Sequence, residues 1–246
     1  MTIFQAIHKT LTLCFLFVFL TGCSEFKSTF DFLSTTPVEE PIDVELPAKT
    51  LAIKGMEDFN VGKYFTAAEF FDEILNKYPF SPEATLAELK AADCSYYRER
   101  YLEALMLYEE FENRHPTNES IPYVMFQKAM CNFKGIDRID RDTTGAKKSI
   151  QLFKQLLKAY PESPYSDVAR TRIEDATEFL ANHEFFVAQY YIRSEKYNQA
   201  IVRLRYLLAA YPHSGVTDQA KVMLTQMEAG EPPRSRFFFW LPRETN

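Results

Sequence analysis

The chain has 246 residues, of which 46% are hydrophobic and 25% charged, as in an ordinary globular protein. Its net charge of -6 and pI near 5.4 argue against a nucleic-acid-binding protein, because no basic face is available to neutralise phosphates. Only 7 glycines stand against 22 phenylalanines and 14 tyrosines, and no alternating strand pattern is present. We therefore expect an all-α chain with aromatic cores.

Residues 1–22 have the pattern of a lipoprotein signal peptide. A lysine precedes a ten-residue apolar run at 11–20, which is too short to span a bilayer comfortably. The run ends in LTGC, which resembles the bacterial lipobox, whose cysteine is acylated and becomes the new N-terminus. We predict lipidation at Cys23, the alternative being an ordinary cleavage site with a cysteine there by chance. The next residue, Ser24, is not Asp, which in such lipoproteins favours export to the outer membrane.

The segment that follows, residues 23–47, contains three prolines and several Ser, Thr and acidic residues. This composition is typical of a flexible tether, here between the lipid and a folded domain. We expect that domain to cover residues 48–229, where a repeat begins.

The repeat consists of helical stretches that end shortly before a proline, at Pro79, Pro116, Pro161 and Pro212. A small residue lies 12 positions before each proline and a large apolar one lies 8 positions before it. The small residues are Ala67, Ala104, Ser149 and Ala200, the large ones are Phe71, Tyr108, Phe153 and Leu204, and the preceding helices supply Gly55, Ala92, Ala129 and Ala188. Small residues let two helices approach closely, as the hairpins of TPR repeats require. We predict a TPR-type helical-hairpin solenoid with four hairpins and a C-terminal capping helix; chance periodicity in a generic helical bundle is the alternative.

Three further segments depart from the regular repeat. A polar insertion at 137–144 accounts for the third pair of small residues being 20 positions apart instead of 12. Between Pro164 and Ser194 no Pro or Gly interrupts the apolar spacing, which predicts one long helix. Residues 214–228 predict the polar-faced capping helix, and a tail rich in Pro and aromatic residues follows at 230–246.

The sequence predicts no catalytic residue, cofactor or metal site. It contains no HExxH, CxxC, GxSxG or Gly-rich phosphate loop. Of the scattered histidines His115, His183 and His213, the first and last flank helix-ending prolines, which favours a helix C-terminal role over metal ligation. Cys94 and Cys131 lie on apolar faces of predicted helices, so we expect core packing, with a disulfide in an oxidising compartment as the alternative.

The insertion contains a charged run made of Asp137, Arg138, Asp140, Arg141 and Asp142. The run lacks the ligand spacing and the glycine of a calcium loop, and its arginines neutralise its carboxylates. We expect a solvated, internally paired loop or, alternatively, a partner-docking loop.

Several longer strings resemble the BamD (ComL) family, the TPR lipoproteins of the outer-membrane β-barrel assembly machinery. They are YPFSP at 78–82, HPTNESIPYVMF at 115–126, DRIDRD at 137–142, YPESPYSDVA at 160–169 and HEFFVAQYY at 183–191, followed by YP at 211–212. The resemblance covers nearly the whole mature chain. It implies five TPR hairpins, no catalysis, and a lipid anchor in the outer membrane with the domain facing the periplasm. It also implies that N-terminal repeats bind unfolded barrel precursors and that C-terminal repeats dock to the barrel subunit, beside other machinery lipoproteins.

The chain departs from this family at its C-terminus. Pro232 and Pro233 and an FFFW tail stand where the second helix of a fifth hairpin is expected. The family's docking residues in that region are therefore not carried over to this chain.

The first helices of TPR hairpins form the concave face, where we predict a protein-binding groove. Its candidate residues are Met56, Phe59, Asp93, Tyr96, Tyr123, Phe126, Met130 and Phe133. Such an aromatic and Met-lined trough suits an extended segment that ends in an aromatic residue, as barrel precursors do in this family. For each residue taken separately, core packing is the alternative.

The tail contains five consecutive large apolar residues, among them Phe238 and Trp240, between arginines and prolines. Left exposed, they would form a patch of the kind that marks an interaction site. The tail could pack back on the last helix, insert into a protein partner, or lie in the membrane interface. We favour packing back, because the last helix otherwise leaves Val222, Leu224 and Met227 half covered.

The sequence thus predicts a non-enzymatic outer-membrane lipoprotein scaffold that supports outer-membrane protein folding and insertion. A periplasmic TPR adaptor for cell-envelope or division proteins is the alternative, although the insertion and the long helix disfavour it. A cell-wall enzyme decorated with TPRs is a third possibility, but the chain leaves no room for a second domain.

Overall fold

Helices joined by short connections form the part of the chain that the computed structural model describes, residues 47–136 and 142–231. In chain order they are α3 (Ala48–Asn60), α4 (Tyr64–Lys77), α5 (Ala84–Tyr97), α6 (Tyr101–Arg114), α7 (Ile121–Lys134), α8 (Thr144–Ala159), α9 (Ser166–Arg193), α10 (Tyr197–Ala210) and α11 (Thr217–Glu228). The predicted signal peptide, most of the predicted tether, most of the insertion and most of the tail lie outside the described residues.

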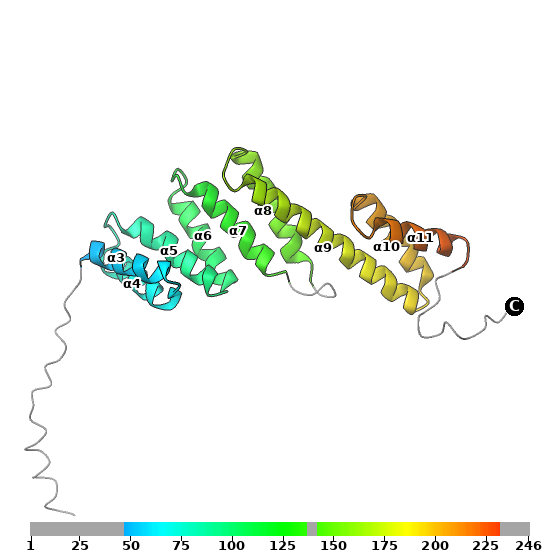
Figure 1. Cartoon of the computed structure of the whole chain (residues 1–246), viewed down its shortest axis with the longest axis horizontal. Helices are drawn as coiled ribbons and strands as arrows, with labels where there is room; N and C mark the ends of the chain where they lie inside the picture. The colour runs from blue at the N-terminus through cyan, green and yellow to red at the C-terminus, as the bar shows by residue number, and fades with distance from the viewer. Residues whose placement is uncertain (1–46, 137–141, 232–246) are drawn as a thin grey trace, which may run out of the picture. The chain divides into compact units, whose positions relative to one another are not determined.

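The helices stack in a row, each packing against the next one in the chain (Figure 1). The hairpins are α3–α4, α5–α6, α7–α8 and α9–α10, and α11 packs on α10 as the last helix described. This arrangement confirms the predicted all-α, TPR-type solenoid of four hairpins and a capping helix. No described helix is both long enough and apolar enough to cross a membrane.

The small and large residues that define the repeat meet inside the hairpins. All of them are buried: Gly55, Ala92, Ala129 and Ala188 on the first helices, Ala67, Ala104, Ser149 and Ala200 on the second, and the large Phe71, Tyr108, Phe153 and Leu204. At Gly55 an added Cβ would lie 2.8 Å from Cε1 of Phe71. The absence of a side chain there is what lets α3 approach the Phe71 ring on α4.

The connections follow two designs. In three tight turns between the helices of one hairpin, the middle residue has a positive φ: Gly62 at 81°, Glu99 at 61° and Glu195 at 58°. Between hairpins, each second helix ends two residues before its proline, as Lys77 does before Pro79. Proline disfavours helical geometry in the residue before it, which explains why the helices stop at that distance.

The long helix α9 confirms the predicted uninterrupted helix, with bounds at Ser166 and Arg193. It belongs to two cores. Ala169, in its first half, packs with Phe153 and Leu156 of α8, whereas Ala188, near its end, packs with Leu204 of α10. Because one helix serves both cores, α9 joins the third hairpin to the last one.

Cys94 and Cys131 are free and buried, and they lie in different core clusters. The disulfide alternative is therefore not realised in this structure. Burial raises the pKa of each thiol from 9.0 to about 12. Both cysteines act as small apolar core residues.

Candidate protein-binding surfaces

The residues predicted to line a groove lie on the first helices of the first three hairpins. They are Met56 and Phe59 on α3, Asp93 and Tyr96 on α5, and Tyr123, Phe126, Met130 and Phe133 on α7. Asp93 has no exposed surface and Met130 is 8% exposed, whereas the others are partly buried. Asp93 and Met130 therefore contribute to the packing of the hairpins and offer almost no contact area to a ligand.

Phe59 belongs to an aromatic cluster between the first and second hairpins. Its ring centroid lies 5.4 Å from that of Tyr64 and 5.7 Å from that of Tyr97, and the last two rings stack at 4.7 Å. Nζ of Lys90 lies 4.6 Å from the Phe59 ring centroid, within the range of a cation–π contact. Tyr97 is 47% exposed, so the cluster presents an aromatic edge to solvent.

The α7 rings belong to a second cluster. Phe126 stacks on Tyr165 at 5.2 Å and lies 5.8 Å from Phe153, while Tyr123 lies 5.7 Å from Tyr165. Phe133 lies 6.5 Å from Phe153. These contacts tie the third hairpin to the start of α9, so much of the surface of these rings is occupied by neighbouring rings.

Asp93 accepts hydrogen bonds from three elements. One of its oxygens accepts from the hydroxyls of Tyr108 at 2.6 Å and Tyr123 at 2.8 Å, and the other accepts from Nζ of Lys90 at 2.8 Å. The Tyr123 hydroxyl in turn accepts from Nε2 of Gln127 at 2.9 Å. Burial, and then the charge of Asp93, raise the pKa of both tyrosines. This network links α5, α6 and α7 through a single buried carboxylate.

In the predicted docking loop, the structure describes only Asp142. Its carboxylate accepts from the Thr144 backbone N–H at 2.9 Å and from the Thr144 hydroxyl at 2.7 Å, and these bonds lower its pKa from 3.8. This is an Asx-type turn that leads the chain into α8. Outside the described residues lie Asp137, Arg138, Asp140 and Arg141, and also Cys23, Phe238 and Trp240, so these stay predictions.

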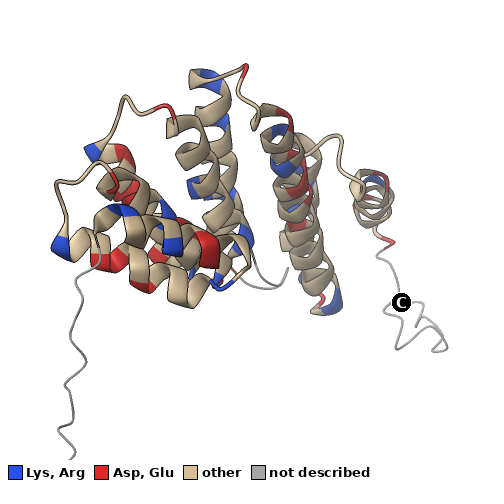
Figure 2. Cartoon of the chain, turned by 60° about the vertical axis from the view of Figure 1, so that its left-hand side comes forward, with Lys and Arg blue, Asp and Glu red and all other residues tan. Residues whose placement is uncertain are grey.

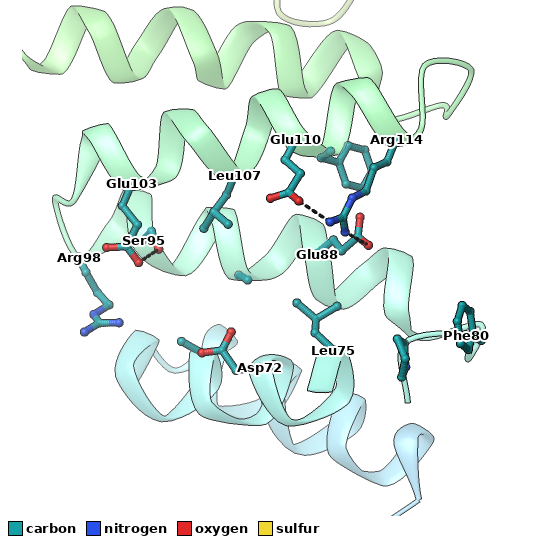
Figure 3. A pocket seen from close by; sticks show the side chains of 14 residues that line it. Asp72, Leu75, Phe80, Glu88, Ser95, Arg98, Glu103, Leu107, Glu110 and Arg114 are labelled. Atoms are coloured by element: carbon teal, nitrogen blue, oxygen red, sulfur yellow. Dashed lines mark hydrogen bonds and ion pairs between the residues drawn. The ribbon is translucent and has the colours of Figure 1, made fainter. Parts of the chain in front are cut away.

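A groove that we did not predict from the sequence lies between α4 and α6, with α5 as its floor (Figure 3). It has a volume of about 560 Å³. Asp72 and Leu75 on α4 form one wall, Glu103 and Leu107 on α6 form the other, and Ala91 lies at the floor. This α4–α6 groove has an apolar middle and charged ends, a combination suited to a protein segment.

One end of the α4–α6 groove is occupied by ion pairs. Arg114 donates to one oxygen of Glu88 at 3.0 Å, and Nε2 of His115 lies 2.8 Å from the other. Arg114 also pairs with Glu110 (Figure 3). Phe80 lies at the rim near this end and is 99% exposed. Phe80 therefore adds exposed apolar surface to this rim of the groove.

At the other end of the groove, the two acidic residues Asp72 and Glu103 differ in their partners. Glu103 accepts from the Ser95 hydroxyl at 3.1 Å, but Asp72 forms no hydrogen bond or ion pair with any residue that the structure describes. Partial burial in the groove, and then the charge of Glu103, raise the pKa of Asp72 above 3.8, while Arg98 at the groove mouth lowers it. A negative charge without a partner therefore faces the groove.

The repeat pattern could not reveal this groove, because it marks the residues between the helices of one hairpin. The groove instead forms between second helices of neighbouring hairpins, and its lining residues on these helices alternate between apolar and charged types. One sequence feature did mark this hairpin. Phe80 follows the helix-ending proline Pro79, whereas the corresponding residue in the other hairpins is Thr117, Glu162 or His213.

Acidic and basic residues are interspersed on the N-terminal helices (Figure 2). Within residues 47–136 and 142–231, no group of three or more His, Cys, Asp or Glu side chains is placed to hold a metal ion.

Comparison with known families identifies the chain. The model of the YfiO family, described as outer membrane lipoprotein, matches residues 45–230, which span every described helix. The chain belongs to the YfiO family of outer membrane lipoproteins. The YfiO match, together with the relatives below, confirms the resemblance to the BamD family.

Several relatives, among them those from Xylella fastidiosa and Vibrio cholerae, are named outer membrane protein assembly factor BamD. The protein from Xylella fastidiosa is 27% identical over 224 residues, covering 87% of this chain and 72% of its own length. The protein from Vibrio cholerae is 29% identical over 196 residues, covering 75% of this chain and 80% of its own length. A crystal structure of a tetratricopeptide repeat protein from Parabacteroides merdae is similar with a TM-score of 0.40 at 14% identity, over 75% of this chain and 74% of that one. The TPR fold assigned above rests on the hairpins themselves.

Proposed function

We propose that this chain is an outer-membrane protein assembly factor. In this proposal it is a lipid-anchored scaffold that binds unfolded β-barrel precursors, the barrel subunit of the assembly machinery and other machinery lipoproteins, and it catalyses no reaction. The observation that carries the proposal is the YfiO match over residues 45–230, supported by BamD relatives that align with most of this chain.

The proposed organisation assigns each segment a role. Residues 1–22 are a signal peptide, residues 23–47 are a tether acylated at Cys23, residues 48–229 are the binding domain and residues 230–246 are a tail. Helices that begin at Ala48 and end at Glu228 support the bounds of the binding domain. In this organisation the domain is held at the periplasmic face of the outer membrane.

The proposed precursor site lies on the first two hairpins. Two surfaces there suit an extended segment: the aromatic cluster around Phe59 and the α4–α6 groove with its exposed Phe80. Unfolded barrel strands alternate apolar and polar residues, which matches an apolar floor with charged ends. For the barrel subunit we propose the helices from α9 to α11, where Val202 is 64% exposed and Tyr206 is 49% exposed.

Depletion of the protein from the cell tests the proposal. We expect several unrelated outer-membrane barrels to fall together in amount, because a single machinery inserts them all. Mass spectrometry of outer-membrane fractions measures this, with periplasmic proteins as the reference. If barrel levels held while septation or cell-wall synthesis failed, the periplasmic adaptor would be the better description.

The lipid anchor has its own test. Cys23→Ala should leave the protein unacylated and recovered in the periplasmic fraction instead of the membrane fraction. Acyl chains supply most of the binding of a lipoprotein to a bilayer, at roughly 0.8 kcal/mol for each buried CH₂. Recovery of the variant in membranes at the parental level would show that another contact attaches the protein.

A further inference from the structure

The two ends of the α4–α6 groove differ in how their charges are balanced. Near Phe80, Glu88 and Glu110 share the cation of Arg114, and His115 also lies against Glu88. At the opposite end, Asp72 and Glu103 face the groove (Figure 3). Glu103 has the Ser95 hydroxyl and, at 3.5 Å, Arg100 as partners, whereas Asp72 has none among the described residues.

The electrostatic environment of Asp72 in the groove disfavours its charged form. The groove walls remove part of its hydration, and Glu103 and Glu69 add like charge, so its pKa is raised. Arg98 opposes this shift, but its guanidinium lies over the Phe65 ring at 5.0 Å instead of pairing with the carboxylate. A ligand cation placed beside Asp72 would therefore gain attraction and relieve repulsion at once.

The middle of the groove sets the second requirement on a ligand. Leu75 on α4, Leu107 on α6 and the small residue Ala91 on α5 line the groove, and Ala91 is 6% exposed. Because Ala91 projects little, an apolar side chain of a bound segment can reach the floor. The groove therefore combines an apolar middle with one end at which the Asp72 carboxylate has no ion-pair partner among the described residues.

We propose that the α4–α6 groove selects an extended segment of an unfolded barrel precursor in which a Lys or Arg side chain lies beside Asp72 and an apolar side chain covers Ala91. This inference rests on the proposed function, and it adds a specificity for positive charge. Asp72 is the residue that determines this specificity, while Glu103 strengthens the negative potential around it. At the Phe80 end, Glu88 and Glu110 already contact Arg114, so the proposal places the charge selection at Asp72.

A peptide-binding measurement tests the inference on the full-length protein in detergent. The probes are two synthetic peptides of alternating Val and Thr ending in Phe, one with a central Lys and the other with Glu at that position. We expect the Lys peptide to bind roughly tenfold more tightly, because the swap replaces an attraction by a repulsion in a partly desolvated groove. Added salt should reduce this ratio.

Variants then assign the preference to one carboxylate. Asp72→Asn should reduce the Lys-to-Glu ratio several-fold, and Asp72→Lys should reverse it. The matched control is Asp167→Asn on α9, whose side chain is 96% exposed and which does not line the groove, and it should leave the ratio unchanged. Asp72 has no partner to lose, so its variants should keep the parental melting temperature.

A crosslink locates the bound peptide. Phe80→Cys places an accessible thiol at the groove rim, while Cys94 and Cys131 are buried. A thiol-attached photocrosslinker should capture the Lys peptide there.

The inference is overturned if neither peptide binds, if the wild-type protein does not discriminate between them, or if Asp72→Asn leaves the ratio unchanged. Those results would leave the proposed function standing if depletion still lowered barrel levels. Charge selection without any effect of depletion would contradict the proposed function instead.

Discussion

At the scale of single residues, Asp93 shows how a polar side chain can organise a helical core. A carboxylate without exposed surface requires partners for its oxygens, and Tyr108, Tyr123 and Lys90 supply them from α6, α7 and α5. Each of these donors depends on the same acceptor. The network therefore fixes the relative placement of two hairpins more specifically than apolar packing alone does.

Replacing Asp93 should be far more harmful than replacing Asp72. Asp93→Ala leaves a buried hydroxyl, a partly buried hydroxyl and an ammonium group without their acceptor, and we expect a loss of about 3 kcal/mol in the free energy of unfolding. Asp72→Ala, on an exposed position of α4, should change it by no more than about 0.5 kcal/mol. Urea unfolding followed by circular dichroism measures both. Similar losses for the two variants would contradict the role assigned to the network.

Buried thiols and partly buried phenols predict a stability limit at alkaline pH. The pKa of Cys94 and of Cys131 rises from 9.0 to about 12, and that of Tyr96 and of Tyr211 from 10.0 to about 12, in each case chiefly through burial. The native state therefore keeps protons that the unfolded state has already lost. Stability should be constant with respect to these groups below pH 9.0 and should fall as pH rises toward about 12.

Thermal melts between pH 9.0 and about 12 measure this fall in stability. The double variant Cys94→Ala/Cys131→Ala should show a shallower decline, because two of the contributing groups are removed. A melting temperature that stayed constant up to pH 12 would show that these groups ionise freely in the folded protein.

At the scale of elements, the hairpins depend on matching a small residue with a large one. Phe71 is fully buried on α4, and its ring occupies the space that a side chain on Gly55 would need. Glycine inside a helix costs stability compared with alanine, roughly 0.5–1 kcal/mol. Here that cost is offset because α3 can pack directly against a buried ring.

Gly55→Ala should therefore destabilise the protein despite the better helix propensity of alanine. Overpacking against a fully buried ring costs about 1–3 kcal/mol, which exceeds the gain in propensity. Adding Phe71→Leu removes the clashing ring atoms, so the double variant should be more stable than the sum of the two single effects implies. Chemical denaturation of the four proteins in this cycle measures the coupling. Additive effects would show that α3 moves aside at no cost.

At the scale of the whole molecule, the last described helix, α11, is incompletely covered. On α11, Met227 is buried against α10, but Val222 is 58% exposed and Leu224 is half-buried. A further helix would normally cover this side in an array of stacked hairpins. The sequence after α11 carries the aromatic tail instead, which lies outside the described residues.

Deleting residues 232–246 tests whether the tail covers α11. If it packs back, the melting temperature of the purified protein should fall without any partner present, by about 2–4 °C for each kcal/mol of lost packing. Val222→Ala serves as a second variant. In the protein that lacks residues 232–246 it should have little effect on the melting temperature, because the tail no longer packs against Val222. An unchanged melting temperature combined with lost co-purification of the barrel subunit would assign the tail to docking.

The sequence by itself determined the hairpins, because their signals are local. Twelve-residue spacings such as Ala92 to Ala104, the prolines and the unbroken stretch that became α9 each act within one hairpin or one helix. Only the tertiary structure decided the surfaces. It buried Asp93, which we had assigned to a groove, because hydroxyls from two other helices converge on it. It also formed the α4–α6 groove from residues of two hairpins, and no spacing within one hairpin specifies how its outer face meets that of the next.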